Sequence, residues 1–258
     1  MMGSAAREWL PAVGVFVIVL VAWEVGFQVL GVQSFLIPRP TVIGEQLVSD
    51  SSTLMRGLLF TGTEAVLGLA IGVALGTAAG FATARWASAR EVLLPVAIGA
   101  STIPIIAFAP ITLNWFGPES LLPRITIVAV MVFFPIMVNT IRGLTNVDPG
   151  ALELMSSYAA GDRRTLTKLR GPNALPYWFT ALKIATTLSV IGAVVGEFFG
   201  GPLYALGIYI TLQTGASKYP SAWAAIVLAC VLGIVLYLAA VALERLTIPW
   251  YTARETAR

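Results

Sequence analysis

Few residues of this 258-residue sequence could do acid–base, metal or nucleophilic chemistry. It contains no histidine, and it therefore lacks the most common general base and the most common transition-metal ligand. Its single cysteine, Cys230, lies inside a hydrophobic run, where we expect it to pack as a small apolar residue. Three glutamates, Glu24, Glu64 and Glu197, fall within hydrophobic runs, where a carboxylate is costly unless it faces protein or water. For each glutamate the sequence leaves a functional role and a structural role open.

Motifs for catalysis are absent from the sequence. The three lysines, Lys168, Lys183 and Lys218, all lie outside the Gly-x-x-x-x-Gly-Lys-Ser/Thr pattern that binds nucleotide phosphates. There is no His-Glu-x-x-His motif, no cysteine pair and no Gly-x-Ser-x-Gly elbow. We therefore predict a protein that is not an enzyme and holds no metal or other cofactor. Nucleic-acid binding is also unsupported, because membrane orientation explains most of the basic cluster.

The composition indicates an integral membrane protein. Hydrophobic residues make up 57% of the chain and charged residues 11%, with a mean hydropathy of +0.85, whereas charged residues reach about 25% in soluble domains. A helix needs about 20 apolar residues to cross the hydrocarbon core of a bilayer. The sequence predicts an all-α fold whose transmembrane helices number about six, near residues 11–31, 58–82, 93–115, 124–143, 180–200 and 221–248.

Lysines and arginines predict the orientation of these spans, because they are enriched in the short cytoplasmic loops of membrane proteins. With the N-terminus inside, twelve basic residues lie at or near the cytoplasmic side and four lie outside. The cytoplasmic set is Arg7, Arg85, Arg90, Arg142, Arg163, Arg164, Lys168, Arg170, Lys183, Arg245, Arg254 and Arg258, and the external set is Arg39, Arg56, Arg124 and Lys218. We therefore predict that both termini and the polar stretch 148–176 are cytoplasmic.

The stretch 148–176 is the only long polar segment of the chain. Asp148 can cap a helix that has Pro149 at its first position, and we expect this helix to run to Ala160 and end at Gly161. A second, basic helix is predicted from residue 162 and is ended by the Gly-Pro pair at 171–172. Apolar residues of the first helix recur at helical spacing and form one stripe, Ala151, Leu154, Met155 and Tyr158. A polar hairpin with such a stripe indicates a docking surface.

Glycines recur at strict four-residue intervals in the second span, at Gly68, Gly72, Gly76 and Gly80. Residues four apart share one face of a helix, and glycines on that face allow the backbone of another helix to approach closely. We predict a helix-packing stripe. The alternative is a flexible hinge that takes part in gating.

The third predicted span has prolines in its interior, at Pro95, Pro104 and Pro110. Interior prolines leave backbone carbonyls without partners, and membrane helices tolerate this where a neighbouring helix, polar side chains or a water-lined cavity satisfies them. We predict that this span lines a translocation pathway, whereas the alternative is a kink that only improves packing. The predicted pathway residues are Pro104, Phe108, Pro110, Asn114, Asn139 and Glu197.

From Glu153 onward, the sequence resembles the cytoplasmic EAA loop of ABC importer permeases. The family pattern has a Glu-Ala-Ala-type start, then a glycine, and then a Leu-Pro pair. Here Leu154-Met155 replace the alanines, Ala159 stands at the glycine position, and Gly171-Pro172 stand at the Leu-Pro position. The glycine is displaced to Gly161, which would lengthen the first short helix by about half a turn.

Other segments of the chain also resemble this family. They are residues 133–140, Asp148-Pro149, Ala174-Leu175-Pro176-Tyr177, Ile37-Pro38-Arg39-Pro40 and Asn114-Trp115-Phe116-Gly117. The resemblance covers nearly the whole chain. It is closest to the nitrate, sulfonate and taurine group of permeases, including its thiamine-precursor (hydroxymethylpyrimidine) and riboflavin branches.

The resemblance implies one transmembrane permease domain over residues 1–258, of the type I (MetI-like) importer architecture, with a core at 58–248 and a coupling loop at 148–176. It implies a multi-pass protein of the bacterial plasma membrane that pairs with a second permease copy, most simply as a homodimer. Two cytoplasmic ATPase subunits, which hold ATP and Mg²⁺, would receive the loop helix, and an external solute-binding protein would deliver substrate. The implied coupling residues are Glu153, Leu154, Met155, Tyr158, Ala159 and Gly161.

The expected function is the ATP-driven import of a small organic nutrient. The group suggests a sulfonate, taurine or nitrate-like anion, a pyrimidine thiamine precursor or a riboflavin-like heterocycle, and no single residue of the sequence chooses among them. One alternative is a self-contained ion-coupled secondary carrier, although such carriers often have internal repeats and the proline-rich span has no second copy. The other alternative is a membrane scaffold, which would leave the proline-rich span without a role.

Overall fold

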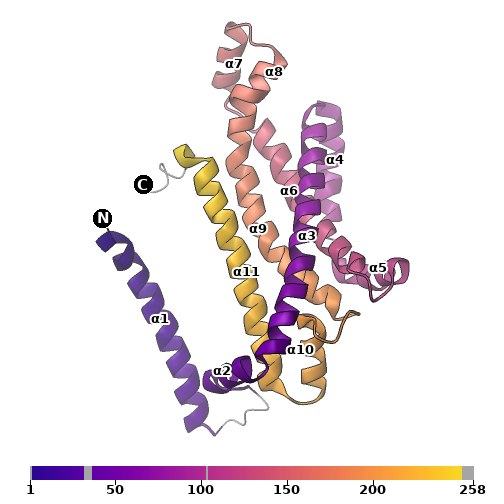
Figure 1. The fold of residues 1–258 in the computed structure, drawn as a ribbon. Helices are drawn as coiled ribbons and strands as arrows, with labels where there is room; N and C mark the ends of the chain where they lie inside the picture. The colour runs from indigo at the N-terminus through magenta and orange to yellow at the C-terminus, as the bar shows by residue number, and fades with distance from the viewer. Residues whose placement is uncertain (1, 32–36, 103, 252–258) are drawn as a thin grey trace.

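The computed structural model describes residues 2–31, 37–102 and 104–251, and the regular structure within them is helical throughout. The helices (Figure 1) are α1 (Met2–Val29), α2 (Pro40–Ser49), α3 (Ser51–Ala84), α4 (Ala87–Ala100), the 3₁₀ helix η1 (Ile105–Phe108), α5 (Ala109–Phe116), α6 (Leu122–Thr145), α7 (Pro149–Ser157), α8 (Asp162–Thr165), the π-helix η2 (Leu166–Arg170), α9 (Gly171–Glu197), α10 (Leu206–Gly215) and α11 (Tyr219–Thr247). The predicted all-α fold is confirmed. Arg254 and Arg258, predicted to be cytoplasmic, lie outside the described residues.

Each predicted transmembrane segment overlaps one or more helices. By length and composition, four helices of the described residues can cross a membrane: α3, α6, α11 and the continuous helix Asp162–Glu197 that contains α9. Ser88–Ala100 and Ile105–Phe116 form a fifth span if the bend between them lies within one crossing. The apolar part of α1, Val13–Val29, is shorter than the four helices that can cross a membrane. A fold with about six spans is compatible with these lengths.

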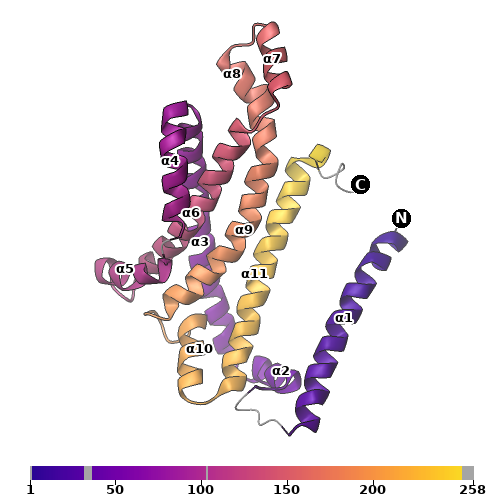
Figure 2. The same cartoon turned by 180° about the vertical axis from the view of Figure 1, so that it is seen from behind.

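The hydrophobic core lies where α3, α6, α9 and α11 pack together (Figures 1 and 2). Val128, Val132 and Ile136 of α6 are fully buried at its centre. They recur every four residues, so one face of α6 points into the core. Ala181 and Ala185 of α9 supply the small side chains opposite them.

The four glycines of α3 all lie buried where α3 contacts α6. A Cβ atom added at Gly72 or Gly76 would lie 2.6 Å from a carbonyl oxygen of α6, and one at Gly80 would lie 2.6 Å from Thr140 Cβ. A Cβ atom added at Gly68 would lie closer still to Val128 Cβ. The two backbones therefore approach more closely than any side chain would allow.

The proline-rich span is bent rather than straight. Its two parts, Ser88–Ala100 and Ile105–Phe116, meet at 82°. Pro104 is in an extended conformation before η1, and Pro110 lies in the first turn of α5, where its missing N–H costs no helical hydrogen bond. The prolines predicted to interrupt this span therefore coincide with its bend.

The end of the bundle opposite α7 and α8 carries α2 and α10 (Figure 1). Glu24 accepts hydrogen bonds there from the backbone N–H (3.0 Å) and hydroxyl (2.9 Å) of Thr41, in the first turn of α2. This contact gives Glu24 a structural role. The hydroxyl of Tyr209 in α10 donates to Asp50 Oδ2 at 2.7 Å, and burial raises the pKa of Tyr209 to about 12, so it remains a donor at neutral pH.

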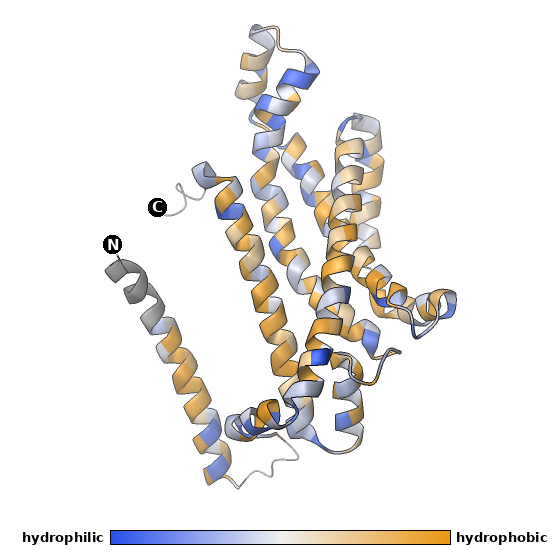
Figure 3. Ribbon diagram, in the orientation of Figure 1, coloured by the Kyte–Doolittle hydropathy of each residue, from blue (hydrophilic) through white to orange (hydrophobic). Residues whose placement is uncertain are grey.

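The outer surfaces of α1 and α11 are apolar, whereas polar residues gather at α7 and α8 (Figure 3). On α11, Val231, Ile234 and Leu238 are exposed, and Cys230 is exposed beside them. Cys230, expected to pack as a small apolar residue, lies instead on this exposed apolar surface of α11. The start of α1 and the end of α11 lie toward the side of the bundle that carries α7 and α8 (Figures 1 and 2).

Candidate functional site

The loop helix α7 projects beyond the helical bundle (Figure 1). Asp148 caps it by accepting a hydrogen bond from the backbone N–H of Ala151 at 3.3 Å, and Pro149 occupies the first turn. Both features follow from the local sequence, because Asp is a preferred N-cap residue and Pro fits the first helical position. The predicted start of this helix is confirmed.

The end of α7 differs from the prediction. The last helical residue is Ser157, and Ala159 has φ = 51°, the left-handed conformation. The N–H of Ala159 donates to Ser156 O (2.9 Å) and that of Ala160 donates to Met155 O (3.0 Å), which is the Schellman arrangement. The predicted helix to Ala160 was therefore wrong: the turn falls at the family glycine position, although an alanine occupies it.

Gly161 does not end α7, as its φ of −67° and ψ of 166° are ordinary extended values. It is instead the N-cap residue of α8. The displaced glycine was predicted to lengthen the first short helix by about half a turn. It does not do so, because α7 already ends at Ser157, before Gly161.

We expect Ala159→Gly to stabilise the end of α7 by about 1 kcal/mol, because a left-handed alanine costs about 1–2 kcal/mol and the gain is partly offset in the unfolded chain. Hydrogen–deuterium exchange of the Ala160 amide should slow by about fivefold. Gly161→Ala is the matched control, since a Cβ there meets nothing within 4 Å and φ is negative. Equal slowing in both variants would contradict this account of the turn.

The basic segment after α7 also differs from the prediction. We expected the Gly-Pro pair to end a separate helix, but Asp162–Glu197 is one continuous helix in which η2 (Leu166–Arg170) forms a π-helical turn. Pro172 has no N–H and its ring would clash with a regular preceding turn. The wider π turn relieves this clash, so the basic segment continues directly into α9.

The apolar stripe of α7 is largely uncovered. Leu154 is 57% exposed and Tyr158 is 73% exposed, whereas Ala151 and Met155 are half-buried. Glu153 is exposed beside them. Large apolar side chains gathered at the tip of a projecting loop are typical of a protein-binding surface.

The base of the loop is fixed to the spans on both sides of it. Asn173 Nδ2 donates to the carbonyls of Gly143 (2.9 Å) and Asn146 (3.0 Å), and Asn146 Nδ2 donates to the Tyr177 hydroxyl (2.8 Å). Gly143 allows α9 to pack closely against α6, because a Cβ atom at this position would lie 2.7 Å from Ala174 Cα. These contacts join the end of α6 directly to the start of α9, between which α7 lies.

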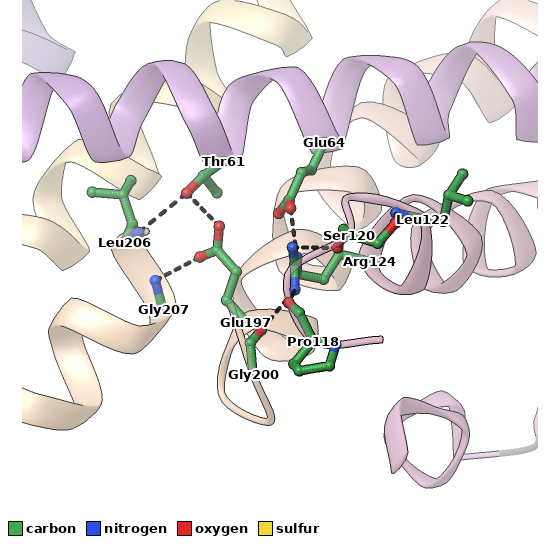
Figure 4. A network of polar contacts seen from close by, with 10 residues as sticks. All are labelled: Thr61, Glu64, Pro118, Ser120, Leu122, Arg124, Glu197, Gly200, Leu206 and Gly207. Atoms are coloured by element: carbon green, nitrogen blue, oxygen red, sulfur yellow. Dashed lines mark hydrogen bonds and ion pairs between the residues drawn. The ribbon is translucent and has the colours of Figure 1, made fainter. Parts of the chain in front are cut away.

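A buried charged network lies near the start of α6 and the end of α9, away from the loop. Figure 4 shows it from close by. The side chains of Glu64 (α3), Arg124 (α6) and Glu197 (α9) have no exposed surface. Arg124 Nε donates to Glu64 Oε1 at 2.5 Å, and Glu197 accepts from Thr61 Oγ1 (2.7 Å) and from the N–H of Gly207 (2.6 Å). The network joins α3, α6, α9 and α10.

Arg124 also donates to three backbone carbonyls, those of Pro118 (3.1 Å), Ser120 (2.6 Å) and Gly200 (2.8 Å). These bonds hold the segments before α6 and after α9 together. From the sequence, Arg124 was predicted to be a charge of the external side, and this role was missed. A carboxylate within a span requires a partner, and that requirement was the signal that could have identified Arg124.

Comparison with known proteins identifies the kind of molecule. Residues 57–248 match the family described as "Binding-protein-dependent transport system inner membrane component". The chain belongs to this family of permeases. The matched region begins in α3 and ends after α11, so it includes the loop, the bent span and the charged network.

Similar permeases cover nearly the whole chain. The formylaminopyrimidine transport permease protein ThiX of Halalkalibacterium halodurans is 32% identical over 240 residues, covering 91% of this chain and 93% of that one. The riboflavin transport system permease protein RibX of Chloroflexus aurantiacus is 30% identical over 253 residues, covering 94% and 91%. The putative aliphatic sulfonates transport permease protein SsuC of Escherichia coli is 27% identical, covering 98% and 97%. Together with taurine and nitrate permeases, these relatives confirm the predicted group of ABC permeases.

The permease presents the predicted pathway residues in different surroundings. Pro104, Pro110 and Asn114 are exposed, and Phe108 is half-buried. Asn139 is half-buried, and its side-chain amide donates a hydrogen bond at 2.8 Å to the carbonyl oxygen of Pro135, a proline inside α6. Glu197 is enclosed in the charged network, and we do not retain it among the pathway residues.

Two further findings concern charged residues outside the buried network. Glu244 of α11 pairs with Lys183 of α9 at 2.8 Å. Within residues 2–31, 37–102 and 104–251, no three His, Cys, Asp or Glu side chains gather closely enough to hold a metal ion.

Proposed function

We propose that this permease is the membrane-spanning subunit of an ATP-driven importer. In this proposal two copies form the pore, α7 of each copy enters a cleft of a cytoplasmic ATPase subunit, and an external solute-binding protein delivers the substrate. Both termini and α7 then lie on the cytoplasmic side. The observation that carries the proposal is the exposed apolar stripe of α7, fixed at its base to two membrane spans.

The geometry supports mechanical coupling and no bond chemistry by this chain. Closure of the ATPase dimer on ATP would draw the two α7 helices together, and the Asn173 and Asn146 hydrogen bonds would carry that movement to α6 and α9. Because the glycine face holds α3 against α6, these helices would move as one body. The substrate path would then open to one side at a time along the bent segment α4–α5.

For the substrate, we propose a small polar organic nutrient. The relatives named above transport a formylaminopyrimidine, riboflavin and aliphatic sulfonates. In such a pore the lining side chains need to be compatible with passage rather than tightly selective, and the binding protein supplies most of the selectivity. Exposed Pro104, Pro110 and Asn114, with half-buried Phe108 and Asn139, are the residues we assign to the path.

We expect Leu154→Asp or Tyr158→Asp to abolish transport and to weaken ATPase binding by about 30-fold or more, the effect of removing an interface hot spot worth about 2 kcal/mol. The measurement uses the permease reconstituted with its partner ATPase and its solute-binding protein. It records substrate uptake, stimulation of ATP hydrolysis and co-purification of the ATPase.

Ser156→Asp is the matched control, because Ser156 is exposed on α7 outside the apolar stripe and should retain transport. Unchanged transport by both stripe variants would contradict the docking role of α7. Uptake that follows an ion gradient and does not need ATP would contradict the importer and favour an ion-coupled carrier.

A further inference from the structure

A cavity of about 740 Å³ lies at the predicted cytoplasmic end of the bundle, beneath the loop. It is formed by the last turns of α3 and α6 and by the basic segment α8–η2, which the proposed coupling role of α7 does not use. Three arginines line it, Arg85, Arg163 and Arg170. One carboxylate, Asp162, lines it with them, so its charged side chains carry a net positive charge.

The arginines of this cavity have unused hydrogen-bonding capacity. In the part of the chain that the structure describes, no carboxylate lies within 4.0 Å of their guanidinium nitrogens. Arg85 stacks at 5.9 Å from the ring of Trp86, and Arg170 is half-buried. Planar guanidinium groups bind phosphate oxygens in pairs of hydrogen bonds, so the lining matches a phosphate-bearing anion.

The other lining residues are apolar. Phe81 and Leu166 remain exposed at the cavity, and Leu144 and Ala84 are buried in its wall. Trp86 is 57% exposed at the end of α3, the position at which aromatic residues mark the membrane interface. A ligand that fills the cavity must therefore present an anionic group to the arginines and hydrocarbon to Phe81 and Leu166.

We propose that this cavity binds the headgroup of an anionic phospholipid from the inner leaflet. The arginines hold the phosphate, and an acyl chain lies against the exposed apolar residues. Basic pockets between transmembrane helices on the cytoplasmic side recognise such headgroups. The bound lipid would link α3 to the π turn at the base of the loop and so help to fix the loop relative to the bundle.

The test uses the full chain in dodecyl maltoside micelles with added dioleoyl phosphatidylglycerol, dioleoyl phosphatidylcholine or inorganic phosphate. Native mass spectrometry reports the bound lipid and its apparent Kd. Phosphatidylglycerol should be retained and phosphatidylcholine should not. Arg163→Gln and Arg170→Gln should each raise the apparent Kd for phosphatidylglycerol by about fivefold.

Arg164→Gln is the matched control, because Arg164 belongs to the same helical segment but does not line the cavity. It should leave the apparent Kd unchanged. Arg170→Lys keeps the charge and should lose less affinity than Arg170→Gln, and circular dichroism checks that each variant is folded. An equal loss in the Arg164→Gln control would overturn the proposal in favour of general charge attraction. Displacement of the lipid by millimolar inorganic phosphate would overturn it in favour of a soluble anion.

Discussion

Replacing Arg124 by methionine is expected to destabilise the permease by about 3–5 kcal/mol, the effect of removing one partner from a buried ion pair. Glu64 and Glu197 would remain enclosed with no cation, and the carbonyls of Pro118, Ser120 and Gly200 would lose their donor. The free energy of unfolding can be measured by titration with sodium dodecyl sulfate in mixed micelles, with far-ultraviolet circular dichroism as the readout.

Arg56→Met provides the matched control for this substitution. Arg56 is an exposed arginine of α3 whose guanidinium carbon lies 4.8 Å from the centre of the Tyr204 ring, a contact worth about 0.5–1 kcal/mol at an exposed site. The double variant Arg124→Met/Glu64→Leu should recover part of the lost stability, because it removes one of the two unpaired carboxylates. Similar losses in Arg124→Met and Arg56→Met would show that the buried network does not stabilise the fold.

Gly72→Ala should cost about 2–3 kcal/mol, the upper part of the range for overpacking. The added Cβ would lie 2.6 Å from the carbonyl oxygen of Ala129 and 2.8 Å from Val132 Cβ. A backbone carbonyl cannot rotate away as a flexible side chain can, so α3 and α6 would have to separate. The same unfolding titration measures the loss.

Gly62→Ala is the matched control on the same helix. A Cβ there would lie 3.5 Å from a methyl group of Leu232, an ordinary contact, and alanine favours helix by up to about 1 kcal/mol over glycine. The pair of variants also separates the two alternatives left open by the sequence. If Gly72→Ala abolished transport without a loss of stability, the stripe would act as a hinge rather than a packing surface.

Local and periodic features of the sequence were sufficient to predict most of the fold. Long apolar runs predicted the membrane helices, the Asp148-Pro149 pair predicted the start of α7, and four-residue spacing placed the glycines on one face. These features depend on neighbouring residues or on one helix period, so no knowledge of tertiary contacts was required.

Features that depend on tertiary contacts or on backbone strain could not be predicted in the same way. The pairing of Glu64 with Arg124 joins residues 60 positions apart, and that of Lys183 with Glu244 joins residues 61 apart. The left-handed Ala159 was missed because glycine is the usual residue in that conformation, and Gly161 lay nearby. The continuation of α9 through Gly171-Pro172 was missed because a π turn has no simple sequence signal.

The position of Cys230 gives the permease a built-in site for spectroscopy. It is the single thiol of the chain and is exposed among apolar residues on the outer face of α11. A nitroxide can therefore be attached to the natural sequence, with no other cysteine to remove. If two copies assemble, each dimer carries two nitroxides, one on each copy, and pulsed dipolar spectroscopy then reports the single distance between them. A change in that distance on addition of ATP would measure how far α11 travels during the transport cycle.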